Sequence, residues 1–400
     1  MKSLAPIALA FAAVVSAAPP QVEITSPRAE TSAFGAVQFT VSVKSAEPVT
    51  RVQFIVDGRP IGERSQPPYS IITMLGDENA EHVFRAEVTA VSGATAAAEL
   101  HTPAFRSNEE VEIELRQLYV RVTKRTASES GGKKVWSEAP ATKLGPEDFT
   151  ISDDGKEQAI KTFASGEAPL AAVVLLDASV SMTGERLKEA LGGAKTLFRA
   201  MAPLDEGKLL VFSDRLLYAS PFTTVSDILL TGLDGVRAQG GTALNDNLYL
   251  ALRQADERQG RRVVILLSDG VDSHSALGMV DVRRVARSSQ AIIYWIRMAD
   301  EGMAGELPNL SSTWRDVKSH QHEFQQLVET VEESGGRVTP VRSLDQIAPA
   351  FADILKELRG QYVLGYYPSE RRHDASWHKI AVSVKDSTLT VHTRDGYLDY

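Results

Sequence analysis

The chain of 400 residues contains no cysteine. This absence excludes a disulfide framework, a zinc site with cysteine ligands and a thiol nucleophile. It also excludes a lipid anchor of the bacterial lipoprotein type, because that anchor is attached to a cysteine. The absence is notable because the N-terminus has the features of an exported chain.

An excess of basic residues is missing as well, since the formal net charge is −9 at pH 7. Nucleic-acid binding needs a basic face, so this composition argues against it. It argues equally against binding to an anionic membrane surface. Beyond the N-terminus, no stretch approaches the roughly 18 apolar residues that a membrane span needs. We therefore expect no nucleic-acid partner and no transmembrane span in the mature chain.

Familiar catalytic motifs are also missing. The sequence has no G-x-S-x-G and no G-x-x-x-x-G-K-[ST]. These absences argue against a hydrolase with a nucleophile elbow and against a P-loop ATPase. We therefore expect that the protein is not an enzyme, and a metal-assisted hydrolase remains the catalytic alternative.

The N-terminus combines a basic residue with a short apolar run. Lys2 precedes apolar residues 4–15, and the small residues 16–18 follow before Pro19 and Pro20. This pattern predicts a secretory signal peptide over residues 1–18, cleaved after Ala18. An uncleaved anchor is the alternative. We expect an exported protein, whether periplasmic, on the cell surface or secreted.

Residues 20–106 alternate apolar and polar side chains with a period of two, which predicts short β-strands. The pattern covers Val37–Val43, Val52–Val56 and Phe84–Ala90, and Asp57-Gly58 marks a hairpin turn. Short strands separated by turns predict a β-sandwich. The segment VQFIVDGRPIGERSQPPYS resembles the Ig-like modules of bacterial surface proteins. We expect an N-terminal Ig-like domain that acts as a spacer.

Two further β-rich segments flank the middle of the chain, at residues 109–165 and 360–400. We expect them to form small flanking sheets that pair with one another and close the chain around the domain between them. Within the first segment, Lys124–Gly145 is polar and is predicted to be an exposed loop.

Between the flanks, residues 168–359 alternate strands with amphipathic helices, which predicts a doubly wound, mostly parallel α/β sheet of the Rossmann-like kind. The predicted strands are Ala172–Leu176, Lys208–Phe212, Leu216–Ala219, Val263–Leu267, Ala291–Ile296 and Arg337–Pro340. The predicted helices are Glu185–Met201, Val225–Leu230, Ala243–Asp256, Val280–Ser289, Glu323–Ser334 and Leu344–Leu358. The polar stretch Ala299–Gln321 is predicted to be a long surface insertion.

Oxygen-bearing side chains gather where three of these elements begin or end. The buried strand before Asp177 runs into Ser179 and Ser181, and a second buried strand ends next to Asp269. A glycine turn, Gly240-Gly241, places Thr242 at a helix start. Ligands bind at the carboxyl edge of the strands in open α/β sheets. Oxygen ligands at this edge suit a hard cation.

Together these five residues resemble the metal-ion-dependent adhesion site of the von Willebrand factor A-type domain, which reads D-x-S-x-S, a distant T and a distant D followed by G. The matching positions are Asp177, Ser179, Ser181, Thr242 and Asp269. The resemblance implies a Mg²⁺ or Mn²⁺ ion held by these residues. It also implies that the metal captures an Asp or Glu carboxylate from a protein partner.

The flanks of this region resemble those of exported bacterial proteins with a von Willebrand A-related domain, a family abundant in acidobacteria. The resemblance covers Val120–Phe163, with Pro146–Phe149, and Leu358–Tyr397, with Tyr362–Tyr366. It implies export but no specific partner, because the functions of that family are largely unestablished.

Each of the five residues also has a purely structural interpretation. Side chains of these types cap helices and hold turns, and a scaffold with a non-functional metal site is the non-catalytic alternative. Capping does not explain why all five converge on one crevice. Next to the site, Asp272, Ser273 and His274 are predicted to form a partner-binding rim.

Overall fold

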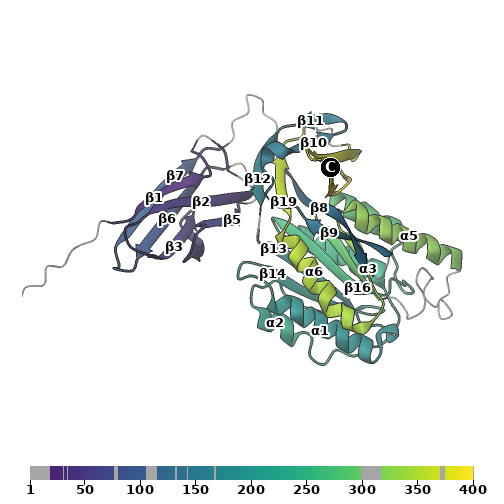
Figure 1. Ribbon diagram of the computed structural model, residues 1–400. Coiled ribbons are helices and arrows are strands. Elements are labelled where there is room, and N and C mark those ends of the chain that lie inside the picture. Colours follow the sequence, from purple (N-terminus) through teal and green to yellow (C-terminus); the bar gives the residue numbers. More distant parts are fainter. Residues whose placement is uncertain are drawn as a thin grey trace, which may run out of the picture. The chain divides into compact units, whose positions relative to one another are not determined.

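The computed structural model describes residues 19–29, 31–33, 35–75, 80–104, 115–130, 133–141, 143–165, 168–298, 317–369 and 374–399 (Figure 1). The chain forms two compact units. Unit 1 comprises Met1–Ser32, Phe39–Ile71 and Glu81–Phe105, and unit 2 comprises Ala33–Gln38, Ile72–Ala80 and Arg106–Tyr400. The predicted signal peptide and residues 299–316 of the predicted insertion lie outside the described residues.

The N-terminal strands form two antiparallel sheets. One contains β1 (Gln21–Ser26), β2 (Ala36–Lys44) and β5 (Ser70–Met74), and the other contains β4 (Arg59–Arg64), β3 (Val49–Val56), β6 (His82–Ala90) and β7 (Thr95–Thr102). Phe39 of the first sheet packs edge-on against Phe54 and Phe84 of the second, at centroid distances of 5.0 and 5.2 Å. The predicted turn has positive φ at Asp57 and Gly58, 48° and 75°, as a tight hairpin requires.

Unit 2 contains two sheets that each combine strands from before and after the α/β region. The first has the order β12 (Ile160–Ser165), β19 (Tyr362–Tyr366), β8 (Arg116–Ser130) and β21 (Leu389–His392), and β9 (Lys133–Pro140) pairs with β8. The second has the order β11 (Lys156–Gln158), β10 (Phe149–Asp153), β20 (Trp377–Val384) and β22 (Gly396–Leu398). The predicted pairing of the two flanks is confirmed, because β19 and β20 join strands from both segments.

The predicted exposed loop over Lys124–Gly145 is wrong for most of its length. Strand β8 continues to Ser130, and β9 returns from Lys133 to Pro140 in antiparallel register. A hairpin ladder is held by backbone hydrogen bonds, so it forms without the apolar alternation that marks a half-buried strand. The polar composition of this stretch therefore misled the prediction.

The α/β region contains a six-stranded sheet in the order β15 (Leu216–Ala219), β14 (Glu206–Phe212), β13 (Leu170–Asp177), β16 (Arg261–Ser268), β17 (Ile292–Met298) and β18 (Arg337–Val341). All neighbouring pairs are parallel except β14 and β15, which are antiparallel as predicted. The helices are α1 (Glu185–Arg199), α2 (Ser226–Thr231), α3 (Leu244–Asp256), α4 (Met279–Ser288), α5 (Val317–Glu333) and α6 (Ile347–Arg359). Short 3₁₀ turns cover Pro146–Asp148, Val180–Met182 and Leu344–Gln346.

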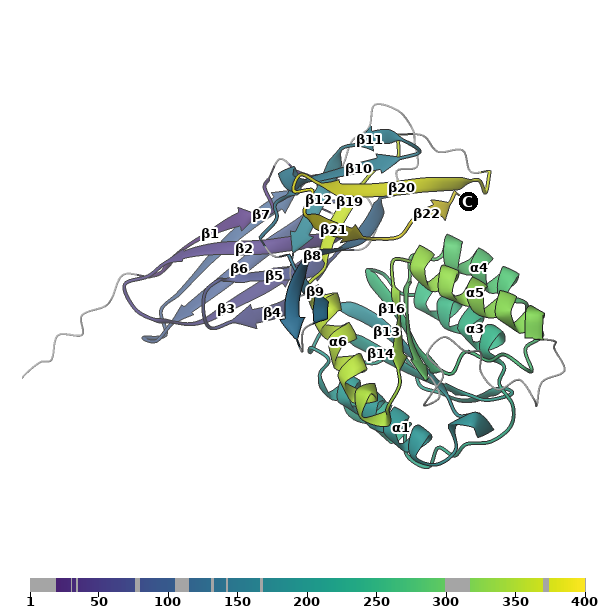
Figure 2. The ribbon, with the colours of Figure 1, turned by 45° about the vertical axis from the view of Figure 1, so that its right-hand side comes forward.

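The helices cover both faces of this sheet (Figure 2). Val174 and Leu176 of β13 pack in one core with α1, α2 and α6, whereas Val173 and Leu175 pack in another with α3, α4 and α5. Successive side chains of a strand point to opposite faces, so a strand covered on both sides needs a continuous apolar run. All eight residues of β13 are accordingly buried.

Helix α5 begins at Val317, before the predicted start at Glu323. The end of the predicted insertion Ala299–Gln321 is therefore helical, and His320 within it is buried. Among the described residues, no helix is both long and apolar enough to span a membrane.

Candidate functional site

The end of β13 places the first three predicted ligands in one loop. Asp177 is the last residue of the strand and is fully buried, Ser179 is buried, and Ser181 is exposed. The Ser179 backbone N–H donates to Asp177 Oδ1 at 2.8 Å, and the hydroxyl oxygens of Ser179 and Ser181 lie 3.0 Å apart. The loop therefore leads from a buried carboxylate through two hydroxyls to the surface.

The second oxygen of Asp177 is bound by a residue that the sequence did not single out. Ser268, the last residue of β16, donates its hydroxyl to Asp177 Oδ2 at 2.7 Å. The same hydroxyl accepts the Gly270 N–H at 3.1 Å. Ser268 thereby connects the D-x-S-x-S loop to the loop that carries Asp269. Its position directly before Asp269 was the only available signal, and serine before a turn is too common to be informative.

Asp177 and Asp269 interact electrostatically across these two loops. Burial, and after it the negative charge of Asp269, raises the pKa of Asp177 to about 7, although hydrogen bonds from Ser268 and Ser179 oppose the shift. When two carboxylates lie close together and are partly shielded from water, ionising both costs free energy. A bound cation would remove that penalty, so the electrostatics of the pair favour cation binding.

The glycine turn before α3 is joined to the same loop by backbone hydrogen bonds. The Val180 N–H donates to Gly240 O at 3.1 Å, and the Gln239 N–H donates to Ala178 O at 2.9 Å. Thr242, which follows this turn, is buried. Gly240 has a φ of 68°, and a Cβ there would lie 2.8 Å from the Asp214 carboxyl carbon. Both the backbone conformation and the space therefore require glycine at this position.

The predicted rim lies against the Thr242 turn. The N–H groups of Ser273 and His274 donate to Thr242 O at 2.8 and 2.9 Å, and the Thr242 N–H donates to Ser273 Oγ at 3.1 Å. The His274 ring covers Gly241, where a Cβ would lie 2.1 Å from the ring nitrogen Nδ1. His274 is exposed and Ser273 is half-buried, so these two residues border the site.

Asp272 does not belong to an exposed rim, contrary to the prediction. Its side chain is buried, and its Oδ2 accepts the Asn245 N–H at the start of α3 at 2.9 Å. Its Oδ1 accepts the Ser275 N–H at 3.2 Å. A carboxylate is favoured at this place because the first N–H groups of a helix have no partner within it. Asp272 therefore positions the loop.

The side chains of the five predicted ligands offer only oxygen atoms. Two carboxylates and three hydroxyls come from three loops at the carboxyl ends of β13 and β16 and the start of α3. Such a set fits a hard divalent cation such as Mg²⁺ or Mn²⁺ and does not favour a soft metal. The structure joins Asp177, Ser179 and Ser181 by hydrogen bonds and Asp269 by its charge. The turn before Thr242 is joined to the same loop through the backbone of Gln239 and Gly240.

Two family models match the sequence. The model described as the von Willebrand factor type A domain matches residues 172–271, which include all five predicted ligands. The model described as a bacterial Ig domain matches residues 20–86. No match was found among the curated proteins.

Several solved structures are similar over parts of the chain. BatB from Bacteroides thetaiotaomicron is 17% identical, with a TM-score of 0.36 over 47% of this chain and 98% of that one. A von Willebrand factor type A protein from Catenulispora acidiphila is 12% identical, with a TM-score of 0.38, and the match covers 74% of this chain and 75% of that one. The vWF domain of the pilus tip protein Mfa5 from Porphyromonas gingivalis is 14% identical, with a TM-score of 0.36, and the match covers 48% of this chain and 95% of that one.

Proposed function

We propose, from the premise that this chain is a von Willebrand factor type A domain protein, that it is an exported binding module. Domains of this type commonly mediate protein–protein interactions. In the proposal, a Mg²⁺ or Mn²⁺ ion at the carboxyl edge of the α/β sheet captures an Asp or Glu carboxylate of a protein partner. The observation that carries it is the buried Asp177, tied to Ser268, next to the charge of Asp269.

Charge counting supports a carboxylate as the ligand from outside. The hydroxyls of Ser179, Ser181 and Thr242 are neutral, so only two carboxylates face a divalent ion. Mg²⁺ takes six oxygen ligands and keeps several of them as water. A carboxylate from a partner can replace one such water and add a negative charge that neutral donors do not provide.

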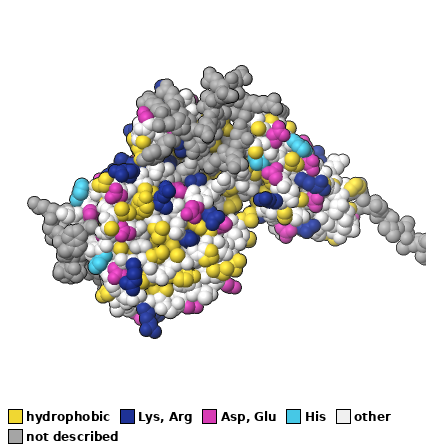
Figure 3. All heavy atoms as spheres, turned by 180° about the vertical axis from the view of Figure 1, so that it is seen from behind, with side chains coloured by type: hydrophobic (Ala, Val, Ile, Leu, Met, Phe, Trp, Pro, Cys, Tyr) yellow, Lys and Arg dark blue, Asp and Glu magenta, His cyan; other side chains and the backbone are white. Residues whose placement is uncertain are grey.

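The exposure of the site residues also supports a ligand that comes from a partner. Asp177 and Ser179 are buried and Ser181 is exposed, so a partner would approach from the Ser181 side. On the face seen in Figure 3, acidic and basic side chains are intermixed and the described residues form no continuous basic area. Recognition of a carboxylate would depend on the metal itself and on bordering residues such as Ser273 and His274, which lie against the Thr242 turn.

Metal titration tests the first half of the proposal. Mg²⁺ and Mn²⁺ are titrated calorimetrically into the wild type, Asp177→Ala and Ser181→Ala. Ser181 is exposed, so its variant keeps the core even if Asp177→Ala fails to fold. Ser42→Ala, an exposed serine of unit 1, is the matched control. Binding that is weakened in both site variants and unchanged in the control supports the proposal, and equal binding in all four proteins contradicts it.

Peptide capture tests the second half. A displayed library of random peptides is selected on the Mg²⁺-loaded chain, with and without chelator. Enrichment of Asp or Glu, lost with chelator and on Asp→Asn or Glu→Gln exchange in the peptide, supports carboxylate capture. Equal capture in chelator contradicts it and favours a scaffold, whereas turnover of a captured peptide would favour the metal-assisted hydrolase.

A further inference from the structure

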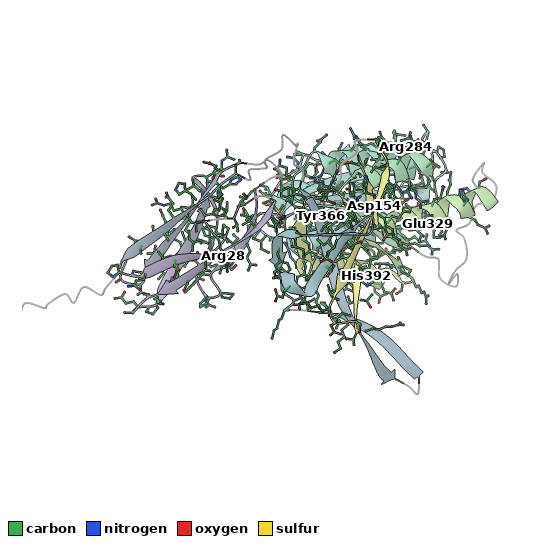
Figure 4. All side chains as sticks on the ribbon, turned by 90° about the horizontal axis from the view of Figure 1, so that it is seen from above. Arg28, Asp154, Arg284, Glu329, Tyr366 and His392 are labelled. Atoms are coloured by element: carbon green, nitrogen blue, oxygen red, sulfur yellow. The ribbon has the colours of Figure 1, made fainter. Side chains whose placement is uncertain are left out.

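A second group of potential metal ligands lies in unit 2, in the sheet formed by the two flanks. Asp153 ends β10, Asp154 begins the turn to β11, and His378 lies near the start of β20. One ligand atom of each of these side chains lies within 4.8 Å of the other two. Figure 4 labels Asp154 of this group and Tyr366, whose hydroxyl donates to Asp153.

The distances fit ligands around one ion. His378 Nδ1 lies 3.0 Å from Asp154 Oδ2 and 3.8 Å from Asp153 Oδ1. Zinc–nitrogen and zinc–oxygen bonds are about 2.0–2.2 Å long. Ligand atoms around a tetrahedral ion with such bonds are therefore separated by about 3.3–3.6 Å. The observed 3.0 and 3.8 Å lie on either side of this range, so small side-chain shifts would bring these atoms to ligand separation.

Asp153 is held so that one carboxylate oxygen faces the histidine. Its Oδ2 accepts the hydroxyls of Tyr366 and Tyr397 at 2.9 and 3.0 Å. Its Oδ1 has no hydrogen-bond partner among the described residues, although the side chain is only 6% exposed. An unpaired buried carboxylate oxygen is costly. The tyrosine hydroxyls therefore leave the free oxygen directed at His378.

Asp154 is oriented in the same manner. Its Oδ1 accepts the Lys379 N–H at 2.8 Å, and Asp154 donates its own N–H to Lys379 O at 2.9 Å. Its Oδ2 is left for His378. The residue has a φ of 47° at the Asp154-Gly155 turn, a conformation that Asp and Asn tolerate better than other residues with a side chain. The turn thus presents two consecutive carboxylates to one side chain of β20.

The imidazole of His378 is held from its other side. Nε2 lies 3.3 Å from Ser376 Oγ and 3.9 Å from Asp399 Oδ2, and the ring stacks on Tyr397 with centroids 5.0 Å apart. Metal-bound histidines usually direct the second ring nitrogen at an oxygen acceptor. With the proton on Nε2, the lone pair of Nδ1 would face two carboxylates, and a bound cation would relieve that repulsion.

We propose that Asp153, Asp154 and His378 form a second cation site, which binds a divalent metal of borderline softness such as Zn²⁺. One imidazole and two carboxylates suit Zn²⁺ better than the oxygen-only set at Asp177 does. Asp154 is 41% exposed, so the ion has a route from solvent. The metal clamps the β10–β11 turn to β20 in a chain that has no disulfide. This site is independent of the proposed function.

Zinc titration of the full chain tests the assignment. Zn²⁺ is added calorimetrically in excess Mg²⁺, which occupies the other site, to the wild type, Asp154→Asn and His378→Gln. Asp386→Asn, at an exposed acid of a turn in the same terminal segment, is the matched control. We expect one Zn²⁺ per chain in the wild type and the control. Both ligand variants should lose more than the roughly 10- to 100-fold in affinity that removal of an outer-shell partner costs.

Two additional measurements keep the result interpretable. Asn tolerates the positive φ of residue 154, so Asp154→Asn is expected to fold, and circular dichroism checks this. Zn²⁺ should raise the midpoint of thermal unfolding of the wild type but not of Asp154→Asn. If the wild type binds no Zn²⁺ in excess Mg²⁺, or if both ligand variants bind it as tightly as the wild type, the cluster is an imidazolium–carboxylate ion pair and the proposal is wrong.

Discussion

Replacing Asp177 by Asn should stabilise the metal-free protein while abolishing metal binding. Burial and the neighbouring Asp269 raise the pKa of Asp177 from 3.8 to about 7 in the folded state. The folded state therefore holds a proton that the unfolded state has already released. Wild-type stability must fall as pH rises from about 4 to about 7, because the unfolded state binds fewer protons in that window.

The size of this effect follows from the shift. A shift from 3.8 to about 7 corresponds to roughly 4 kcal/mol at about 1.36 kcal/mol per pKa unit. An amide keeps the contacts, since its oxygen can accept the Ser179 N–H and its NH₂ can donate to Ser268 Oγ, yet it has no charge. We expect Asp177→Asn to match the wild type near pH 4 and to exceed it by up to roughly 4 kcal/mol near pH 8.

Urea unfolding in chelator, followed by tryptophan fluorescence at several pH values, measures the difference. All four tryptophans, at positions 136, 295, 314 and 377, belong to unit 2, so the signal is specific for the unit that contains Asp177. Saturating Mg²⁺ should stabilise the wild type and leave the variant unchanged. Parallel pH profiles of the two proteins in chelator would refute the electrostatic reasoning.

Three further predictions concern the same unit. Asp269→Ala should weaken Mg²⁺ binding at least about tenfold by calorimetry. Metal-free thermal stability should be kept, because the negative charge of Asp269 repels that of Asp177; a large loss of stability in chelator would contradict this. Gly270→Ala should cost at least about 2 kcal/mol in urea unfolding, because φ is 86° and a Cβ would lie 2.2 Å from the Trp295 ring; an unchanged midpoint would contradict it. Glu333→Gln should lower the free energy of unfolding by about 1–3 kcal/mol, because Glu333 accepts paired hydrogen bonds from two arginines of α4. A change within about 0.5 kcal/mol, as at an ordinary surface position, would contradict a stabilising role of these hydrogen bonds.

The local sequence was sufficient for most elements of the α/β region. The predicted helix Ala243–Asp256 differs by one residue from α3, and the predicted strand Val263–Leu267 lies inside β16. Both succeed because a helix with one buried face repeats its apolar residues every 3.6 positions, whereas a strand covered on both faces is apolar throughout. The pairing of the two flanks was also predicted, whereas the alternation of apolar and polar residues indicated only that each flank contains strands.

The sequence was insufficient where backbone hydrogen bonding or long-range contacts decide the structure. The β8–β9 hairpin has polar side chains and is held by its backbone ladder, so periodicity gave no signal there. Asp272 looked like an exposed rim residue, but it caps α3 from 27 positions away. Nothing local distinguishes a capping aspartate from one that faces a partner.

By itself, then, the sequence determined which residue types are available to the candidate site: Asp177, Ser179, Ser181, Thr242 and Asp269, each at the end or start of a recognisable element. Tertiary structure decided their environment. It brought Ser268 to Asp177 across 91 positions and Asp154 to Lys379 across 225. Such contacts depend on strand order and register, which arise only when the buried faces of distant elements pack together. The orientation of each carboxylate is a product of that packing.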